Sequence, residues 1–208
     1  MTLKIHHLNN SRSQRILWLL EELGVPYEIV HHQRDAVTNL APPELCAVHP
    51  LGKSPMIEDD GKIVTESAAI VEYLCERHGG DRFVPARGTD DHIRYLEWLH
   101  FAEGSAMTPI LLNLYTSRLG DGGAPLRPRI DQQLHSHFQY MEDSLLPSGY
   151  FVGDSLTGAD IMLSFPAEAA VKMGYAADKP KLTAFVAAIH ARPAYQTALE
   201  KGGPYVYA

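Results

Sequence analysis

The segment from His49 to Leu74 reads HPLGKSPMIEDDGKIVTESAAIVEYL, and the rest of the chain is organised around it. It joins a Gly-Lys-Ser-Pro corner, an Asp-Asp-Gly turn between two β-prone runs, and a polar start to a helix. Because Asp-Gly between apolar runs is a strong hairpin signal, we predict strands over residues 56–58 and 62–64. A helix is expected over residues 68–78, ended by two glycines. Each of the three features is also a common way of presenting backbone groups to a ligand.

The residues before this segment predict a strand, a helix and a second strand. Residues 3–8 and 27–32 are β-prone, and between them apolar residues recur at helical spacing over residues 12–23. Gly24 follows this helix and a proline stands two residues later, which is typical of a helix end. Two strands joined through a helix are expected to be parallel. With a short helix at residues 44–47, the order predicts an α/β layer of thioredoxin-like form.

The residues after this layer predict helices only. Glycine and proline gather at residues 79–91 without apolar periodicity, which indicates a linker. Thr157 and Asp160 occupy the N-cap and N3 positions of a capping box at the start of one helix, flanked by the apolar pair of a hydrophobic staple. Further helical patterns cover residues 93–107, 130–146, 182–190 and 194–201. The predicted architecture is therefore an α/β domain in residues 1–80, a linker at 81–91 and an all-helical domain in residues 92–208.

Composition and charge exclude several classes of function. The 208 residues carry a formal net charge of -7 and no run of Lys or Arg, so we expect neither nucleic acid nor an anionic membrane surface as partner. The two cysteines show neither disulfide nor zinc spacing, and the histidine pairs at residues 6–7 and 31–32 would alternate across strands, so no metal site is expected. An N-terminus without an apolar signal region and the lack of any membrane-spanning run lead us to expect a cytoplasmic protein.

Three short motifs could hold a ligand, and each also has an ordinary structural interpretation. Ser11 precedes a helix and has Gln14 three residues later, so it is either a helix cap or a hydroxyl that stabilises an anion such as a thiolate. The residue before a proline is driven to an extended conformation, so Ser54 before Pro55 either starts a strand or offers its backbone to a peptide ligand. The sequence leaves open whether the peptide bond before this proline is cis or trans.

The third motif begins the helix after the hairpin. Glu66 and Ser67 are either a cap, or a carboxylate and a hydroxyl that hold the ammonium and carboxylate of an amino-acid head group. Lys53 is either a solvated cation or the partner of a ligand carboxylate. All three motifs fall at strand ends or helix starts of one α/β layer, where ligands of such sheets commonly bind. Their combination favours a binding site more than any one of them does.

Together these motifs resemble the glutathione S-transferase family over nearly the whole chain. The run HPLGKSP followed by ESAAI looks like the family's glutathione-binding segment, and SRSQR before LLEELG is similar to its first helix. LTGADI resembles the capping motif of its helical domain, and RPAY its last helices. The N-terminal region most resembles the fungal and bacterial Gtt1-like group. The resemblance implies a thioredoxin-like N-terminal domain followed by an all-helical domain, glutathione as co-substrate, and a homodimer.

The resemblance also implies roles for individual residues. Ser11 falls where serine-type members place the hydroxyl that hydrogen-bonds the glutathione thiolate, with Asn10 and Ser13 as neighbours that take the role if the loop is shifted. The family implies that Ser54, before a cis proline at residue 55, pairs with the cysteinyl backbone and that Lys53 meets the glycyl carboxylate. Glu66 and Ser67 would bind the γ-glutamyl head.

The electrophile is less well specified by the sequence. The first long helix of the second domain is expected to face the tripeptide site, which makes Ser105, Met107 and Tyr115 candidates for the electrophile pocket, although an apolar stripe at helical spacing is more often core. The expected function is conjugation of glutathione to small hydrophobic electrophiles, with a role in detoxification. Alternatives are a glutathione-dependent peroxidase, isomerase or dehalogenase on the same scaffold, or a non-catalytic protein that binds glutathione or apolar ligands.

Overall fold

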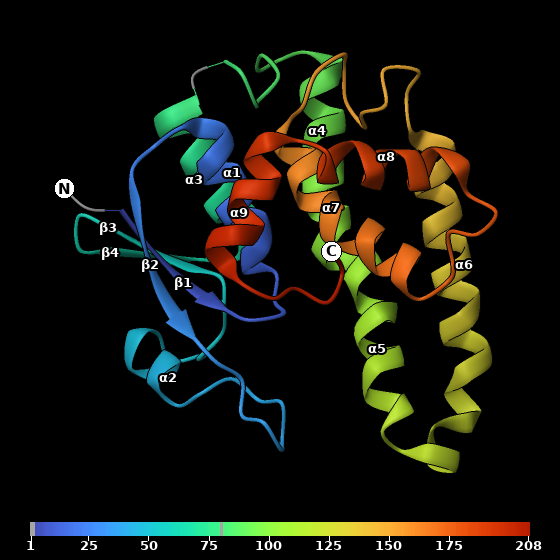
Figure 1. Cartoon of the computed structure of the whole chain (residues 1–208). Helices are drawn as coiled ribbons and strands as arrows, with labels where there is room; N and C mark the ends of the chain where they lie inside the picture. The colour runs from blue at the N-terminus through green and yellow to red at the C-terminus, as the bar shows by residue number, and fades with distance from the viewer. Residues whose placement is uncertain (1–2, 80) are drawn as a thin grey trace. The chain divides into compact units, whose positions relative to one another are not determined.

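The β-prone runs of the first part of the chain form a mixed sheet of four strands. The structure is a computed structural model that describes residues 3–79 and 81–208 (Figure 1). The strand order is β2-β1-β3-β4, with β1 parallel to β2 and antiparallel to β3, and with β3 antiparallel to β4. The strands are β1 (Leu3–Leu8), β2 (Tyr27–His32), β3 (Met56–Asp59) and β4 (Lys62–Thr65). The parallel pairing expected for the first two strands is confirmed.

The hairpin between β3 and β4 has the turn that its sequence predicts. Asp60 and Gly61 lie between the strands with φ angles of 52° and 76°. Two central residues with positive φ define the turn whose twist matches that of the strands, and Asp-Gly is a preferred sequence for it. The turn sets the register in which Ile57 pairs with Val64 and, on the other side of β3, with Ile5. Ile5 and Ile57 are fully buried, so this register places the sheet's apolar face in the core.

Four α-helices accompany the sheet. They are α1 (Ser13–Leu23), α2 (Glu44–Val48), α3 (Ser67–Leu74), which continues through one π-helical turn (Cys75–Gly79), and α9 (Pro193–Gly202). Helix α1 is buried along most of its length because α9 packs against it (Figure 1). The indole of Trp18 meets the ring of Tyr195 edge to face at 5.6 Å, and Arg192 forms a two-pronged ion pair with Glu22. Gly24 ends α1 in the left-handed conformation, as predicted.

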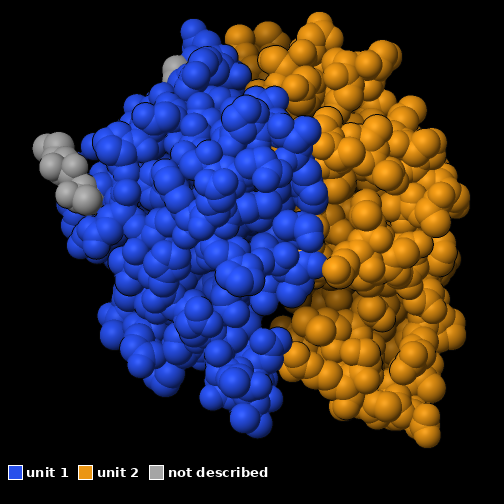
Figure 2. Space-filling view, viewed as in Figure 1, with its two compact units in different colours: residues 1–84, 190–206, 208 blue, residues 85–189, 207 orange. Residues whose placement is uncertain are grey.

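The chain divides into two compact units that differ from the expected division at the C-terminal end. The first unit holds the sheet and also includes residues 190–206, so α9 belongs with α1 (Figure 2). The second unit comprises residues 85–189 and Tyr207. The sequence pattern of α9 predicts a helix with one apolar face, but it does not say which unit covers that face.

The second unit is helical. Its helices are α4 (Asp90–Phe101), a π-helical turn (Ala102–Ala106), α5 (Met107–Ser117), a 3₁₀ segment (Gly120–Leu126), α6 (Arg127–Ser144), α7 (Gly158–Lys172) and α8 (Pro180–His190). Helix α7 is buried from residue 158 to residue 170 and forms the centre of this unit. A thioredoxin-like sheet unit and a helical unit are the fold class that the sequence predicted.

Buried carboxylates fix the starts of two of these helices. Asp160 accepts hydrogen bonds from the backbone N–H of Thr157 at 2.7 Å and from that of Phe151 at 2.9 Å, so the predicted cap also ties down the loop before α7. Burial raises the pKa of Asp160 to about 6. Glu142 of α6 accepts hydrogen bonds from the first free N–H groups of α8, at residues 181 and 182. These side chains satisfy donors that a helix N-terminus leaves without partners.

The helix expected over residues 93–107 is interrupted earlier than predicted. Helix α4 ends at residue 101, and a π-helical turn precedes α5. Pro109 has no N–H to donate to the carbonyl four residues before it, which belongs to Ser105. His137 of α6 instead hydrogen-bonds to the backbone of Ser105. The proline was visible in the sequence, but the widened turn that accommodates it was not.

Candidate functional site

A small hollow in the first unit gathers the polar residues of the His49–Leu74 segment. Its volume is about 90 Å³. The residues that line it include Lys53, Ser54, Pro55, Glu66 and Ser67, all five of the glutathione-binding residues expected from the sequence, together with Arg12 and His49. The chain reaches this hollow three times: at the start of α1, in the corner before β3, and at the start of α3.

The corner before β3 has a shape that only part of its sequence explains. The Ser54–Pro55 peptide bond is cis, and the Ser54 hydroxyl donates a hydrogen bond to the carbonyl of His6 at 2.9 Å, which ties the corner to β1. Gly52 has a φ of 55°, and a Cβ atom there would lie 2.5 Å from the sulfur of Cys46. Glycine is therefore required at residue 52 for two reasons: the positive φ angle, and the short distance to the Cys46 sulfur, which leaves no room for a Cβ atom. The corner leaves Lys53 exposed at the hollow.

The start of α3 carries a strained residue and a buried hydroxyl. Glu66 has a φ of 67°, although it is not a glycine, and its side chain is exposed at the hollow. Strain of this kind persists only where surrounding structure fixes it, and it often marks binding sites. Ser67 is buried and accepts a hydrogen bond from the guanidinium of Arg15 at 3.4 Å. A fixed cation behind Ser67, in the first turn of a helix, makes this corner favourable for an anion.

The loop between β1 and α1 holds the three candidates for the thiolate donor, Asn10, Ser11 and Ser13, and their side chains have different surroundings. Ser11 is only 5% exposed, and its oxygen accepts a hydrogen bond from the backbone N–H of Ser13 at 3.2 Å. The residue next to it, Arg12, lines the hollow, whereas Ser11 is not among the residues that line it. The Ser13 hydroxyl is fully buried. Asn10 has a φ of 50°, and its side chain accepts a hydrogen bond from the backbone N–H of Val206.

Arg12 and His49 were not assigned a role from the sequence. The signal available for Arg12 was a basic residue directly after Ser11, at the start of a helix. His7 was also overlooked, because a histidine on a strand is ordinarily a buried or solvated side chain. In the structure its ring lies behind the loop, with Nε2 at 3.1 Å from the carbonyl of Gly202. Burial and the neighbouring His31 lower the pKa of His7 to about 4, so the ring is neutral near pH 7.

The three candidates for the electrophile pocket do not line one cavity within the second unit. Ser105 lines a cavity together with the rings of Trp98, Phe101 and Tyr140. Met107 is buried and Tyr115 is 57% exposed, and neither lines that cavity. The electrophile pocket thus stays a prediction.

Residues 3–79 and 81–208 hold neither a metal-binding cluster nor a membrane-spanning helix. Among these residues, no group of three or more His, Cys, Asp or Glu side chains could hold a metal ion. None of the helices that they form is long and apolar enough to cross a membrane.

The fold is that of a thioredoxin-like sheet unit with a charged hollow, followed by a helical unit. Residues 1–76 match the family model of the glutathione S-transferase N-terminal domain, and residues 124–202 match that of the C-terminal domain. The chain therefore belongs to the glutathione S-transferase family and is an enzyme of that family. The resemblance seen in the sequence is confirmed.

Individual relatives match over almost their whole length. The chain is 33% identical to glutathione S-transferase 1 of Saccharomyces cerevisiae, with 96% of this chain and 94% of the relative covered. It is 34% identical to glutathione S-transferase 3 of Schizosaccharomyces pombe, over 95% of this chain and 86% of the relative. A crystal structure of a glutathione S-transferase from Actinobacillus pleuropneumoniae is similar with a TM-score of 0.87 and 36% identity, covering 97% of this chain and 93% of the other.

Proposed function

We propose that this enzyme conjugates the thiolate of glutathione to small hydrophobic electrophiles. The observation that carries the proposal is the hollow, which brings two cations and one carboxylate together at the ends of three elements. Glutathione has two carboxylates and one ammonium group, so its charges are complementary to the two cations and one carboxylate that line the hollow. Residues 92–208 are proposed to contribute the electrophile contacts, including those of Ser105, Met107 and Tyr115.

The charges of the hollow suggest how glutathione is held. Lys53 and Arg12 line the hollow and are proposed to meet its carboxylates, and Glu66 is proposed to meet its ammonium group. Ser67 adds a hydroxyl and the first backbone N–H of α3 for the γ-glutamyl carboxylate, as at other helix N-termini that bind anions. Ser54 and Pro55 are proposed to meet the cysteinyl backbone, whose amide groups would then pair as in an added strand.

Ser11 is proposed to stabilise the thiolate. The thiolate is the nucleophile, and an ordinary cysteine thiol has a pKa of about 8.5, so only a few per cent is ionised at pH 7. A hydroxyl that donates a hydrogen bond to sulfur, at the N-terminus of the 11-residue helix α1, favours the anion. Each unit by which the thiol pKa falls towards neutral pH raises the thiolate fraction about tenfold. The thiolate then attacks an electrophilic carbon and forms the C–S bond. With an aryl halide, the bond from that carbon to the halogen breaks, and the halide leaves with its electron pair.

The tripeptide site can be tested by calorimetric titration with glutathione. Glu66→Gln removes the negative charge and keeps the shape, so we expect the Kd for glutathione to rise about tenfold or more, as for loss of a charged hydrogen bond. The matched control is Glu28→Gln, because Glu28 is an exposed carboxylate on β2 outside the hollow. Equal affinity in both variants would contradict the role of Glu66, and no binding of glutathione to the unaltered enzyme would contradict the proposed function.

The role of Ser11 is tested by the kinetics of conjugation to a generic aryl halide. Ser11→Ala is expected to lower kcat about tenfold to a hundredfold and to leave the KM for glutathione little changed, because the hydroxyl acts on the thiolate. Ser155→Ala is the control, since Ser155 is exposed in the loop before α7. Full activity of Ser11→Ala would refute the proposed thiolate donor.

The setting of the enzyme is also proposed. We infer a cytoplasmic homodimer with a role in detoxification, on the strength of the family and of two cysteines that form no disulfide. Sedimentation equilibrium of the purified protein tests the dimer, and a monomer mass at micromolar concentration would refute it.

A further inference from the structure

A chain of hydrogen bonds runs behind Ser11 to the far end of helix α9. The Ser11 oxygen lies 2.7 Å from the oxygen of Ser13, which in turn lies 2.8 Å from Nδ1 of His7. The other ring nitrogen of His7, Nε2, lies 3.1 Å from the carbonyl oxygen of Gly202. All three side chains are buried, with Ser11 5% exposed, His7 4% and Ser13 fully covered. All four residues belong to the first unit.

The direction of each hydrogen bond follows from the groups that can only accept. The Gly202 carbonyl has no hydrogen, so Nε2 of His7 must carry one and donate it. A neutral ring then has a lone pair on Nδ1, which accepts the single hydrogen of the Ser13 hydroxyl. The Ser13 hydroxyl has a second possible acceptor in the carbonyl of Leu8, at the longer distance of 3.3 Å. In either case Ser13 has no hydrogen left for Ser11, so Ser11 must be the donor between the two hydroxyls.

The surroundings of His7 keep this direction constant near neutral pH. The ring of His31 meets that of His7 edge to face at 5.9 Å, and both lie in the parallel pair of strands β1 and β2. Burial of the His7 ring opposes its charged form, and the electrostatic effect of His31 opposes it further, so the pKa of His7 is lowered. His7 is therefore an acceptor at Nδ1 under the conditions in which the enzyme works.

We propose that His7 and Ser13 are positioning residues that keep the hydroxyl hydrogen of Ser11 turned into the protein, where a bound thiolate must compete for it. This inference rests on the proposed function, in which Ser11 serves the thiolate. It goes beyond that function because it states where the hydrogen is before the thiolate arrives. The Ser11 oxygen itself keeps its place during the exchange, since the backbone N–H of Ser13 holds it.

Because the thiolate competes with Ser13 for this hydrogen, we expect one substitution to lower the pKa of bound glutathione, whereas loss of a supporting residue would ordinarily raise it. In the unaltered enzyme the thiolate gains a charge-assisted hydrogen bond from Ser11, but the bond between the two hydroxyls is lost at the same time. Ser13→Ala removes the internal acceptor, so the Ser11 hydrogen is available to the thiolate at no such cost. We therefore expect Ser13→Ala to lower the pKa of enzyme-bound glutathione by about half a unit to one unit. A purely structural role for Ser13 would leave that pKa unchanged or raise it.

The experiment is a pH titration of the ultraviolet absorbance of the thiolate in the enzyme–glutathione complex. A lower pKa in Ser13→Ala than in the unaltered enzyme supports the proposal, and an equal or higher pKa overturns it. Ser164→Ala is the matched control, because it also removes a buried serine hydroxyl, one that donates to the carbonyl of Ile161 in α7. No shift is expected there.

A second substitution keeps the test decisive if Ser13→Ala does not fold. His7→Leu removes the acceptor of the Ser13 hydroxyl and leaves that hydroxyl free to donate to Ser11. The pKa of bound glutathione should fall again, by less than in Ser13→Ala, because the Leu8 carbonyl remains an alternative acceptor. A rise or no change in His7→Leu overturns the proposal.

A double substitution separates this inference from the function on which it rests. Ser11→Ala should raise the pKa of bound glutathione towards its value in solution, and adding Ser13→Ala to it should produce no further shift. If Ser11→Ala leaves the pKa unchanged, the thiolate role of Ser11 itself is wrong. If Ser11→Ala raises the pKa but Ser13→Ala does not lower it, only the competition between Ser13 and the thiolate is refuted.

Discussion

Replacement of Asp160 by alanine should destabilise the second unit severely. Its carboxylate accepts hydrogen bonds from the backbone N–H groups of Phe151 and Thr157 and from the Thr157 hydroxyl, at 2.7 to 2.9 Å. All three residues are buried, so alanine would leave two backbone donors without water or protein partners. Each such donor costs about 1–3 kcal/mol, and loss of the helix cap adds about 1 kcal/mol. The expected loss is about 3–7 kcal/mol, a large part of the stability of an ordinary domain.

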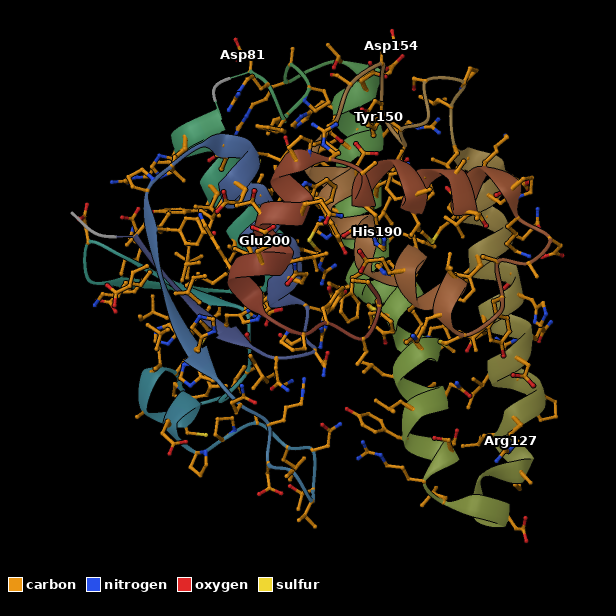
Figure 3. The ribbon with its side chains drawn as sticks, in the orientation of Figure 1. Asp81, Arg127, Tyr150, Asp154, His190 and Glu200 are labelled. Carbon is orange, nitrogen blue, oxygen red and sulfur yellow. The ribbon has the colours of Figure 1, made fainter. Side chains whose placement is uncertain are left out.

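Equilibrium unfolding in urea measures this loss from the shift of the midpoint at a constant slope. The titration is best made at about pH 7.5, where a group with a pKa of about 6 is ionised, and at one protein concentration, since association changes apparent stability. The control is Asp154→Ala, because Asp154 is an exposed carboxylate in the same loop (Figure 3). If Asp160→Ala costs no more than about 1 kcal/mol, or no more than the control, then the cap does not stabilise the fold as argued.

Three further predictions concern other parts of the first unit. The pKa of His7 is lowered to about 4, so the contribution of its neutral ring to stability is present above pH 6.5 and is lost as the pH falls. Between pH 6.5 and 4, the free energy of unfolding of the unaltered enzyme should fall by about 3 kcal/mol relative to that of His7→Leu. Parallel pH curves for the two proteins would refute this. Burial raises the pKa of Cys75 to about 12, so mass spectrometry after iodoacetamide treatment of the folded enzyme should find only Cys46 alkylated. In urea unfolding, Gly52→Ala should cost more stability than Gly61→Ala. Both glycines have positive φ, but of the two only residue 52 would place a new Cβ against another atom, the Cys46 sulfur at 2.5 Å. Equal costs of the two substitutions would contradict this.

Local chemistry made much of the fold predictable from the sequence. The Asp60–Gly61 turn and the apolar pattern around it determine both the hairpin and its register, because a slip by one residue would expose the apolar face. The cap at Asp160 was likewise readable, since its residues stand within one turn of the helix. The hydrogen bond between Asp160 and the backbone of Phe151 could not be predicted, because nothing in the sequence pattern shows that the preceding loop folds back onto the start of α7.

The candidate site was predictable to a similar extent. Lys53, Ser54 and Glu66 come together because the hairpin between them brings its two ends to one edge of the sheet, and the sequence shows that hairpin. The surroundings of Ser11 were beyond prediction. Gly202 is 195 residues away from His7, and its carbonyl decides which nitrogen of that ring carries the hydrogen. A pattern of residue types contains no information on such a distant backbone group.

The position of α9 has a consequence for the order in which the enzyme is made. The first unit combines residues up to 84 with residues 190–206, so its core beside α1 stays open until residues 190–206 leave the ribosome. Domains that are continuous in sequence can fold during synthesis, one after another. Here all the helices of the second unit, within residues 85–189, are synthesised before residues 190–206 of the sheet unit. We therefore expect the sheet unit to be the last to close, although its strands are synthesised first.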